Sequence, residues 1–349
     1  MMQRFLLTLI FLTIFLTSFS QTVKQRYDST FHVLTKMLEG KTKPDFKRAV
    51  FMVENSFLDG KMGYQKFCKA IDYYEMLCRR LIESRDLQYS ESDKEKVSVH
   101  AAVFTIMKDT LPIQLHNGEI IHHLPFGYDF NDINGEEDWT KMFVSKLLTT
   151  NKGNCHSLPY LYKIIAEELG EKAYLAFAPN HVYIKLHSKA FGWYNTELTS
   201  GLFPIDSWLM ASGYIHLNSV QNGVYMDTLS QKQSIAACMI DLANGYKRKF
   251  GTGNGEFILK SCHKALNHYP DYLNAMLLKA ETELELWKAD TSEPKDQKRK
   301  DFLEIQKLYT KIHQLGYRKM PEEMYLDWLV SLKEERYKYQ NKNININFE

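Results

Sequence analysis

Cys155 is the residue of this sequence best placed for nucleophilic chemistry. It follows the turn Lys152-Gly153-Asn154 and opens an apolar-striped segment that predicts a helix from about residue 155 to 169. Unpaired N–H groups and the dipole at a helix start favour a thiolate, and the backbone N–H of Cys155 could donate to a developing oxyanion. We interpret Cys155 as a candidate nucleophile; the alternative is a small cysteine packed in an apolar core.

A thiolate nucleophile needs a base, and the base needs an acceptor that orients it. His181 begins a strictly alternating strand candidate, residues 181–187, and Glu197 lies near the end of the next one, residues 192–198. A hairpin can set His181 opposite Glu197 on one face, with Cβ atoms ~5 Å apart. The spacing therefore predicts a base and its orienting acid, although each residue alone could equally be structural or solvated.

The register that pairs His181 with Glu197 makes further predictions. It sets Tyr183 opposite Asn195 and Lys185 opposite Trp193. Asn195 shares the face of Glu197 because strand side chains alternate, so it is the substitute orienter. His156, next to the cysteine, is interpreted as a residue of the helix surface.

Three sequence blocks resemble the transglutaminase-like superfamily, a group with a papain-like cysteine fold. The blocks are Gly153-Asn154-Cys155-His156-Ser157-Leu158, Pro179-Asn180-His181-Val182-Tyr183, and Trp193 to Gly201 with Glu197 inside it. The resemblance covers about residues 136–205. It is closest to a compact bacterial branch with helices before the core and tetratricopeptide repeats after it; Ala265 to Pro270 with Ala275 and Ala280 is similar to such a repeat boundary.

The resemblance implies that Cys155 is the nucleophile, His181 the general base and Glu197 the orienting acid. It implies an α+β fold with a small antiparallel sheet in the core. Two residues depart from the family pattern. Glu197 stands in place of the usual Asp and reaches one methylene further, and Pro159 lies in the first helical turns. Some relatives with this layout lack the cysteine, so a non-catalytic member is the alternative.

Residues 173–177 are predicted to be a strand, residues 111–135 a long loop or short strands, and most other elements helical. The N-terminal helices include one opened by Pro44-Asp45 and one opened by a capping-box pattern at Ser92-Asp93-Lys94-Glu95. The C-terminal helices are predicted at residues 233–249, 256–268, 271–286, 301–315 and 321–337, with a polar linker at 290–299. We divide the chain into a signal peptide (1–20), a helical N-terminal region (21–135), the core (136–232), a helical tetratricopeptide-like region (233–340) and a poorly ordered polar tail (341–349).

The N-terminus has the pattern of a secretory signal peptide. Arg4 supplies a positive charge, an apolar run follows from Phe5 to Phe19, and Ser18 and Ser20 are the small residues of a cleavage site. The run is shorter than the ~20 residues of a membrane span. We therefore expect a secreted or periplasmic protein without a membrane span after signal removal.

Five cysteines in an exported chain are too few for a disulfide scaffold. Cys68 and Cys78 lie ten residues apart in one predicted helix, ~15 Å apart and too far to bridge. Cys238 and Cys262 lie on separate predicted helices and could pair with each other. The odd count leaves at least one thiol unpaired unless it bonds another chain.

Composition excludes several other classes of protein. Forty-four Lys and Arg against 42 Asp and Glu give a net charge of +2, which disfavours a dedicated nucleic-acid binder. His122-His123 with Asp129 and Asp132 lacks the spacing of a metal site, so we expect no metal and no cofactor. The glycine-rich segment 251–255 lacks the lysine of a phosphate loop, and the basic residues of 295–300 suit a solvated linker.

These patterns lead to three functional hypotheses. The first is an exported thiol enzyme that hydrolyses a peptide or protein amide or transfers its acyl group to an amine. The second is a non-catalytic binding module that recruits a protein partner through its C-terminal helices. The third is a purely structural helical scaffold. The complete set of Cys155, His181 and Glu197 favours the first.

Overall fold

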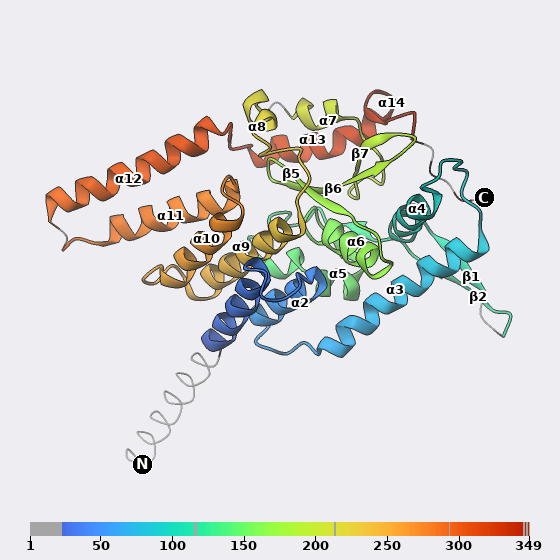
Figure 1. Cartoon of the computed structure of the whole chain (residues 1–349), viewed down its shortest axis with the longest axis horizontal. Coiled ribbons are helices and arrows are strands. Elements are labelled where there is room, and N and C mark those ends of the chain that lie inside the picture. The colour runs from blue at the N-terminus through green and yellow to red at the C-terminus, as the bar shows by residue number, and fades with distance from the viewer. Residues whose placement is uncertain are drawn as a thin grey trace, which may run out of the picture. The chain divides into compact units, whose positions relative to one another are not determined.

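The computed structural model describes residues 23–114, 117–212, 214–292, 294–344, 346 and 348, shown in Figure 1. The predicted signal peptide lies outside these residues. The fold is α+β, with about 58% helix and only small sheets. Within the described residues, no helix combines the length and the apolar character needed to cross a membrane.

The chain forms two compact units, and each combines two separate segments. The first unit contains the chain up to Gly63 together with Gln231–Phe302, and the second contains Tyr64–Ser230 together with Leu303–Glu349. The predicted regions, in contrast, are consecutive along the chain. All the candidate site residues belong to the second unit.

The first unit is helical. Its elements are residues 23–38, α2 (Phe46–Phe57), α9 (Gln231–Phe250), α10 (Glu256–His268), α11 (Leu273–Ala289) and the beginning of α12 (Lys295–Gln314). Asp45 caps α2 as the sequence predicts, because its side chain accepts the N–H of Arg48 at 2.8 Å. Tyr27 is fully buried, with its ring edge-to-face against Tyr246 and Phe257. Helix α10 packs against both α9 and α11.

The second unit surrounds a three-stranded sheet with helices. The helices are α3 (Tyr64–Ser84), α4 (Lys94–Lys108), α5 (Val144–Thr150), α6 (Ser157–Glu168), α7 (Asp206–Ala211), α8 (Leu217–Gln221), the end of α12, α13 (Glu322–Glu334) and α14 (Arg336–Tyr339), with the 3₁₀ helix η1 at Trp139–Met142. The strands are β1 (Leu111–Gln114), β2 (Ile120–His123), β3 (Gly127–Tyr128), β4 (Lys152–Gly153), β5 (Tyr174–Ala178), β6 (His181–Ser188) and β7 (Gly192–Thr196). Helix α6 packs on strands β5 and β6, and these three elements are labelled in Figure 1.

The sheet has the order β5-β6-β7, and all of its pairs are antiparallel. Asn180, with φ +55°, and Pro179 make the tight turn that starts β6 at His181. The predicted hairpin between β6 and β7 is present, but its register is wrong by two residues. Lys185 pairs with Asn195 and not with Trp193. A slip of two residues leaves every side chain on the same face of the sheet. His181 and Glu197 therefore still share one face, as predicted.

Several local predictions are also corrected. The capping box predicted with Ser92 and Glu95 does not form, because the N-cap residue of α4 is Asp93. The Asp93 side chain makes no cap hydrogen bond and instead accepts Tyr89 Oη–H at 2.7 Å and the Lys189 N–H at 2.9 Å. The predicted linker at 290–299 already contains the first turn of α12. In the C-terminal tail, Ile344 and Ile346 are buried, and Phe348 forms an antiparallel β-bridge with Leu87. These contacts order a segment predicted to be poorly ordered.

The cysteines are all free thiols. Cys78 is buried in α3, whereas Cys68, on the same helix, is partly exposed. Cys238 and Cys262 do not form the disulfide that the sequence allowed. Cys155 is likewise free, which leaves its sulfur for other chemistry.

Candidate active site

The turn that carries Cys155 is built around the buried side chain of Asn154. Its Oδ1 accepts the backbone N–H groups of His156 at 3.0 Å and Ser157 at 3.2 Å, which satisfies donors at the start of α6. Its amide nitrogen donates to the carbonyl of Ile133 at 3.2 Å. Cys155 is therefore fixed two residues before the first residue of α6, close to the helix start that the sequence predicted.

Gly153 is required by the tight packing under this turn. A Cβ at this position would lie 2.5 Å from Ser157 Oγ and 2.9 Å from Leu147 Cδ1. Ser157 Oγ in turn accepts the N–H of Asn154 at 3.1 Å. A side chain at position 153 would thus displace the hydroxyl that helps to hold the turn.

His181 and Glu197 form the pair that the sequence predicted. His181 Nε2 lies 2.6 Å from Glu197 Oε2, and their side chains are 0% and 3% exposed. Because of the shifted register they are diagonal neighbours rather than opposite ones, a distance within the reach of a long side chain. The extra methylene of Glu suits this diagonal position.

The other oxygen of Glu197 is also held in place. Oε1 accepts the backbone N–H of Thr199 at 2.7 Å, and the Glu197 N–H donates to the Leu202 carbonyl at 2.9 Å in a short turn that follows β7. Lys108 lies near this carboxylate. Burial lowers the pKa of Lys108, and the negative charge of Glu197 opposes this fall. Burial alone would raise the pKa of Glu197, but the charge and hydrogen bond of His181 hold it below its usual value.

The Cys155 thiol completes the group, because it lies close enough to His181 for each residue to shift the pKa of the other. Burial would raise the pKa of Cys155, but the adjacent His181 and its charge lower it below the usual value. Burial would lower the pKa of His181, but the carboxylate of Glu197 and the contact with Cys155 raise it to about 10. Both shifts favour a thiolate beside an imidazolium, the form in which a cysteine is nucleophilic.

Two tyrosines that the sequence analysis missed complete the surroundings of the thiol. Tyr325 of α13 places its hydroxyl 3.2 Å from His181 Nδ1 and close to Cys155, where it contributes to lowering the pKa of the thiol. Tyr128 of β3 places its hydroxyl beside both Cys155 and Tyr325. They come from positions 27 residues before and 170 residues after Cys155 in the sequence, so no local pattern indicated them.

Helix α13 covers this site. The rings of Trp208 and Trp328 stack with centroids 4.3 Å apart, and both contact His181 edge-on. Asn180 Nδ2 donates to the carbonyl of Met320 just before α13, at 3.3 Å, and the Cys155 sulfur lies 3.6 Å from the carbonyl oxygen of Asn180. Cys155 is only 7% exposed, so little of its surface is accessible to solvent.

Two neighbouring residues have structural positions. Asn195, the substitute orienter, donates from Nδ2 to Asp206 Oδ1 at 2.8 Å and to the carbonyl of Pro204 at 3.1 Å, so its amide is directed to these two residues. His156 is half-buried rather than on the helix surface, and its Nδ1 lies 2.8 Å from the carbonyl of Met142. The charge of His156 also contributes to lowering the pKa of Cys155.

The residues weighed as metal ligands have other partners. His123 Nε2 lies 2.6 Å from the carbonyl of Ile106, and Asp132 accepts three backbone N–H groups in the following turn. Asp129 pairs with Lys141 at 3.5 Å. These side chains organise the loop that leads into η1.

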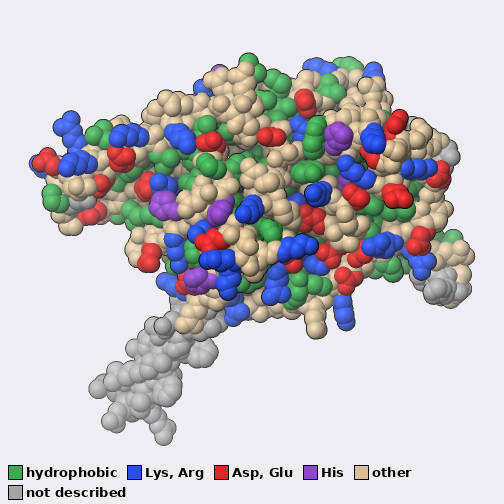
Figure 2. Space-filling model, viewed as in Figure 1, with side chains coloured by type: hydrophobic (Ala, Val, Ile, Leu, Met, Phe, Trp, Pro, Cys, Tyr) green, Lys and Arg blue, Asp and Glu red, His purple; other side chains and the backbone are tan. Residues whose placement is uncertain are grey.

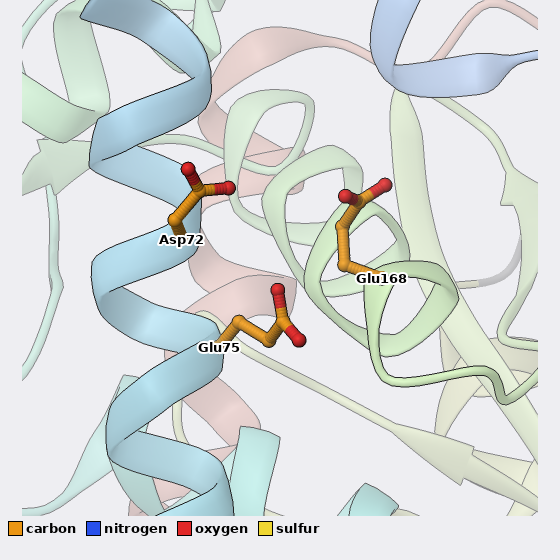
Figure 3. A group of neighbouring side chains, drawn as sticks. All are labelled: Asp72, Glu75 and Glu168. Atoms are coloured by element: carbon orange, nitrogen blue, oxygen red, sulfur yellow. The ribbon is translucent and has the colours of Figure 1, made fainter.

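A different acidic group occurs where α3 approaches α6. Asp72, Glu75 and Glu168 bring carboxylate oxygens within 4.8 Å of one another, as Figure 3 shows. Glu75 also accepts two hydrogen bonds from Arg79, at 2.7 and 2.9 Å. Exposed acidic groups of this kind are common without a cation, and we assign no metal to this one.

Charge on the molecular surface is mixed. On the face shown in Figure 2, Lys and Arg side chains alternate with Asp and Glu over the elements of the chain. Such mixing gives little of the single-sign field that steers nucleic acids. It agrees with the nearly balanced composition.

Comparison of the chain with known proteins gives no match to a family model, a curated protein or a solved structure. We therefore infer a function from the residues and geometry of the site.

Proposed function

We propose that this protein is a thiol-dependent enzyme acting on peptide or protein amides, with Cys155 as nucleophile, His181 as base and Glu197 as orienting acid. The observation that carries the proposal is the arrangement around His181. One ring nitrogen hydrogen bonds the buried carboxylate of Glu197 at 2.6 Å, and the Cys155 thiol lies close enough to the ring for the charge of His181 to lower its pKa. A nucleophile, a base and an orienting acid in that order are the components of acyl transfer through a covalent intermediate.

Each residue has a defined part in the proposed reaction. The Cys155 thiolate attacks the amide carbonyl carbon, and the C=O electron pair moves to oxygen. When the intermediate collapses the C–N bond breaks, and the His181 imidazolium gives its proton to the leaving amine. Water or a second amine then attacks the thioester with His181 as base, and the Cys155 thiolate is released.

The wider assignment follows the resemblance of the sequence. We propose a transglutaminase-like core for the second unit and a tetratricopeptide-like arrangement for the helices α9 to α11. The mutual packing of α10 with α9 and α11 supports the latter. Export through the N-terminal signal sequence is part of the same proposal, with hydrolysis and acyl transfer as the two possible fates of the acyl group.

Burial of the site supports a second candidate, a binding module without catalysis. Cys155 and His181 are 7% and 2% exposed, and α13 lies over them. As an enzyme, the protein must move α13 to admit a substrate. As a binding module, it would use the same residues as part of a packed core.

Selective alkylation separates the two candidates. Iodoacetamide applied at pH 6, followed by peptide mass analysis, should label Cys155 faster than Cys68, although Cys68 is the more exposed. The reason is that alkylation requires a thiolate, and His181 stabilises one at Cys155. His181→Gln removes the imidazolium and should abolish this advantage, while Cys68 labelling stays unchanged as the internal control. Slow labelling of Cys155 in the wild type and the variant alike would support the binding module.

A further inference from the structure

Tyr128 is held beside the candidate nucleophile by backbone pairing. Strands β3 and β4 are parallel, with Tyr128 paired to Gly153, two residues before Cys155. The N–H groups of Gly127 and Asp129, on either side of Tyr128, donate to the carbonyls of Asn151 and Gly153 at 2.8 and 2.7 Å. The position of Tyr128 is therefore fixed to the same turn that fixes Cys155.

The hydroxyl of Tyr128 is a buried donor without a partner. Its oxygen is inaccessible to solvent and makes no hydrogen bond of normal geometry to any described protein atom, although it borders Cys155 and Tyr325. An unpaired buried hydroxyl is costly, and such a group in a folded protein calls for an explanation. The phenol also keeps its proton at neutral pH, because burial and the nearby Cys155 charge raise its pKa well above 10.

The backbone N–H of Cys155 is a second donor close to the sulfur. No hydrogen bond among the described residues occupies the backbone N–H of Cys155, whereas Asn154, His156 and Ser157 around it all have bonded N–H groups. The Tyr325 hydroxyl, in contrast, is engaged at 3.2 Å with His181 Nδ1. Two unoccupied donors, the Tyr128 hydroxyl and the Cys155 N–H, thus lie close to the sulfur to which a substrate carbonyl would bond.

We propose that Tyr128 is a catalytic residue whose hydroxyl, together with the Cys155 backbone N–H, stabilises the oxyanion of the tetrahedral intermediate. This inference rests on the proposed function. When the S–C bond forms, the negative charge leaves sulfur and moves to the carbonyl oxygen one bond further out. A donor that is unpaired in the resting state gains its hydrogen bond only as this charge develops, and this difference lowers the barrier. When the C–N bond breaks, the carbonyl reforms and Tyr128 still holds its proton.

The proposal separates two reactions of the same thiol. Acylation of Cys155 by p-nitrophenyl acetate forms an oxyanion and releases p-nitrophenolate, whereas alkylation by iodoacetamide displaces iodide and forms no oxyanion. Both reagents need the same access past α13, so the ratio of their rate constants cancels any effect of opening. The rates are measured where they rise linearly with reagent concentration, and mass analysis assigns the modified cysteine.

Tyr128→Phe removes the hydroxyl and keeps the ring. We expect the acylation rate constant to fall by on the order of 10²-fold, as for loss of one oxyanion donor, and the alkylation rate constant to change by less than about 3-fold. The thermal midpoint should stay the same or rise, because no hydrogen bond is lost. Tyr194→Phe is the matched control, since it removes the hydroxyl of another tyrosine buried in the same unit and should change neither rate.

Two results would overturn the assignment of Tyr128. Equal falls in acylation and alkylation would show that the hydroxyl acts on the thiolate, and unchanged rates for both reactions would show that it has no role. A wild-type Cys155 that neither reagent modifies would overturn the proposed function itself, and the assignment of Tyr128 with it. These outcomes are distinguishable because the wild-type reactions are measured first.

Discussion

Replacement of Glu197 by Gln tests the electrostatic centre of the site. The amide keeps the length of the side chain and an oxygen that accepts the His181 Nε2–H, but it removes the negative charge 2.6 Å from the ring. The pKa of His181 is raised from 6.5 to about 10, with the charge of Glu197 first among the favourable causes. At about 1.4 kcal/mol for each pH unit, this difference corresponds to about 5 kcal/mol, which Glu197 shares with Cys155. We expect Glu197→Gln to lower the free energy of unfolding by about 3 kcal/mol at pH 7, similar to other broken buried ion pairs.

The pH dependence of this loss has a definite sign. Folded His181 holds its proton up to about pH 10, whereas the unfolded residue loses it near pH 6.5. The stabilisation from the imidazolium is therefore complete below pH 6.5 and is lost as the pH rises through 10. The difference between wild type and Glu197→Gln should be largest just below pH 6.5 and should narrow as the pH rises toward 10.

Urea unfolding followed by tryptophan fluorescence measures the effect. Trp208 and Trp328, two of the five tryptophans, contact His181, so part of the signal reports on the site. Glu304→Gln is the matched control, because its exposed pair with Lys307 should contribute about 0.5 kcal/mol or less. A loss below about 1 kcal/mol in Glu197→Gln, independent of pH, would refute the assignment of the buried carboxylate as the partner of an imidazolium.

Three further substitutions test other parts of the site. Cys155→Ser should unfold in urea within about 1 kcal/mol of wild type, because it opens no large cavity; a loss of several kcal/mol would mark the thiol as core packing. Gly153→Ala should cost about 1–3 kcal/mol in the same assay, because its Cβ would meet Ser157 Oγ at 2.5 Å; an unchanged stability would contradict the tight turn. Tyr325→Phe removes a donor to the thiol, so the apparent pKa for alkylation of Cys155 should rise; an unchanged pH profile would leave Tyr325 with a packing role only.

The sequence contained the local part of this site. A glycine-containing turn before an apolar stripe predicted the helix start at Cys155, and strict alternation predicted the strand that begins at His181. The pairing of His181 with Glu197 was predicted from the wrong register, and it holds because a two-residue slip leaves both side chains on one face. Strict alternation along a strand predicts well which face of the sheet each side chain occupies. It predicts the register of two strands only where one register buries more apolar surface than the alternative registers do.

The nonlocal part of the site was beyond such reasoning. Tyr128 and Tyr325 reach Cys155 through a two-residue parallel pairing and a C-terminal helix, and neither leaves a periodic signal near the cysteine. The buried C-terminal tail was missed for a related reason, because Ile344 and Ile346 are isolated apolar residues in an Asn-rich segment. The packing of single side chains against residues distant in the sequence depends on the whole fold. Composition and local periodicity do not predict it.

The ultraviolet absorbance of the thiolate at Cys155 tests the central claim most directly. A pH titration of wild type minus Cys155→Ser isolates this thiol from the other four cysteines, among which burial raises the pKa of Cys262 to about 12. The structure leads us to expect thiolate absorbance already present at neutral pH, titrating below the usual value of 9.0, and lost at neutral pH in His181→Gln. A difference spectrum that develops only at pH 9 or above, with or without His181, would contradict the thiolate–imidazolium pair and the enzymatic proposal built on it.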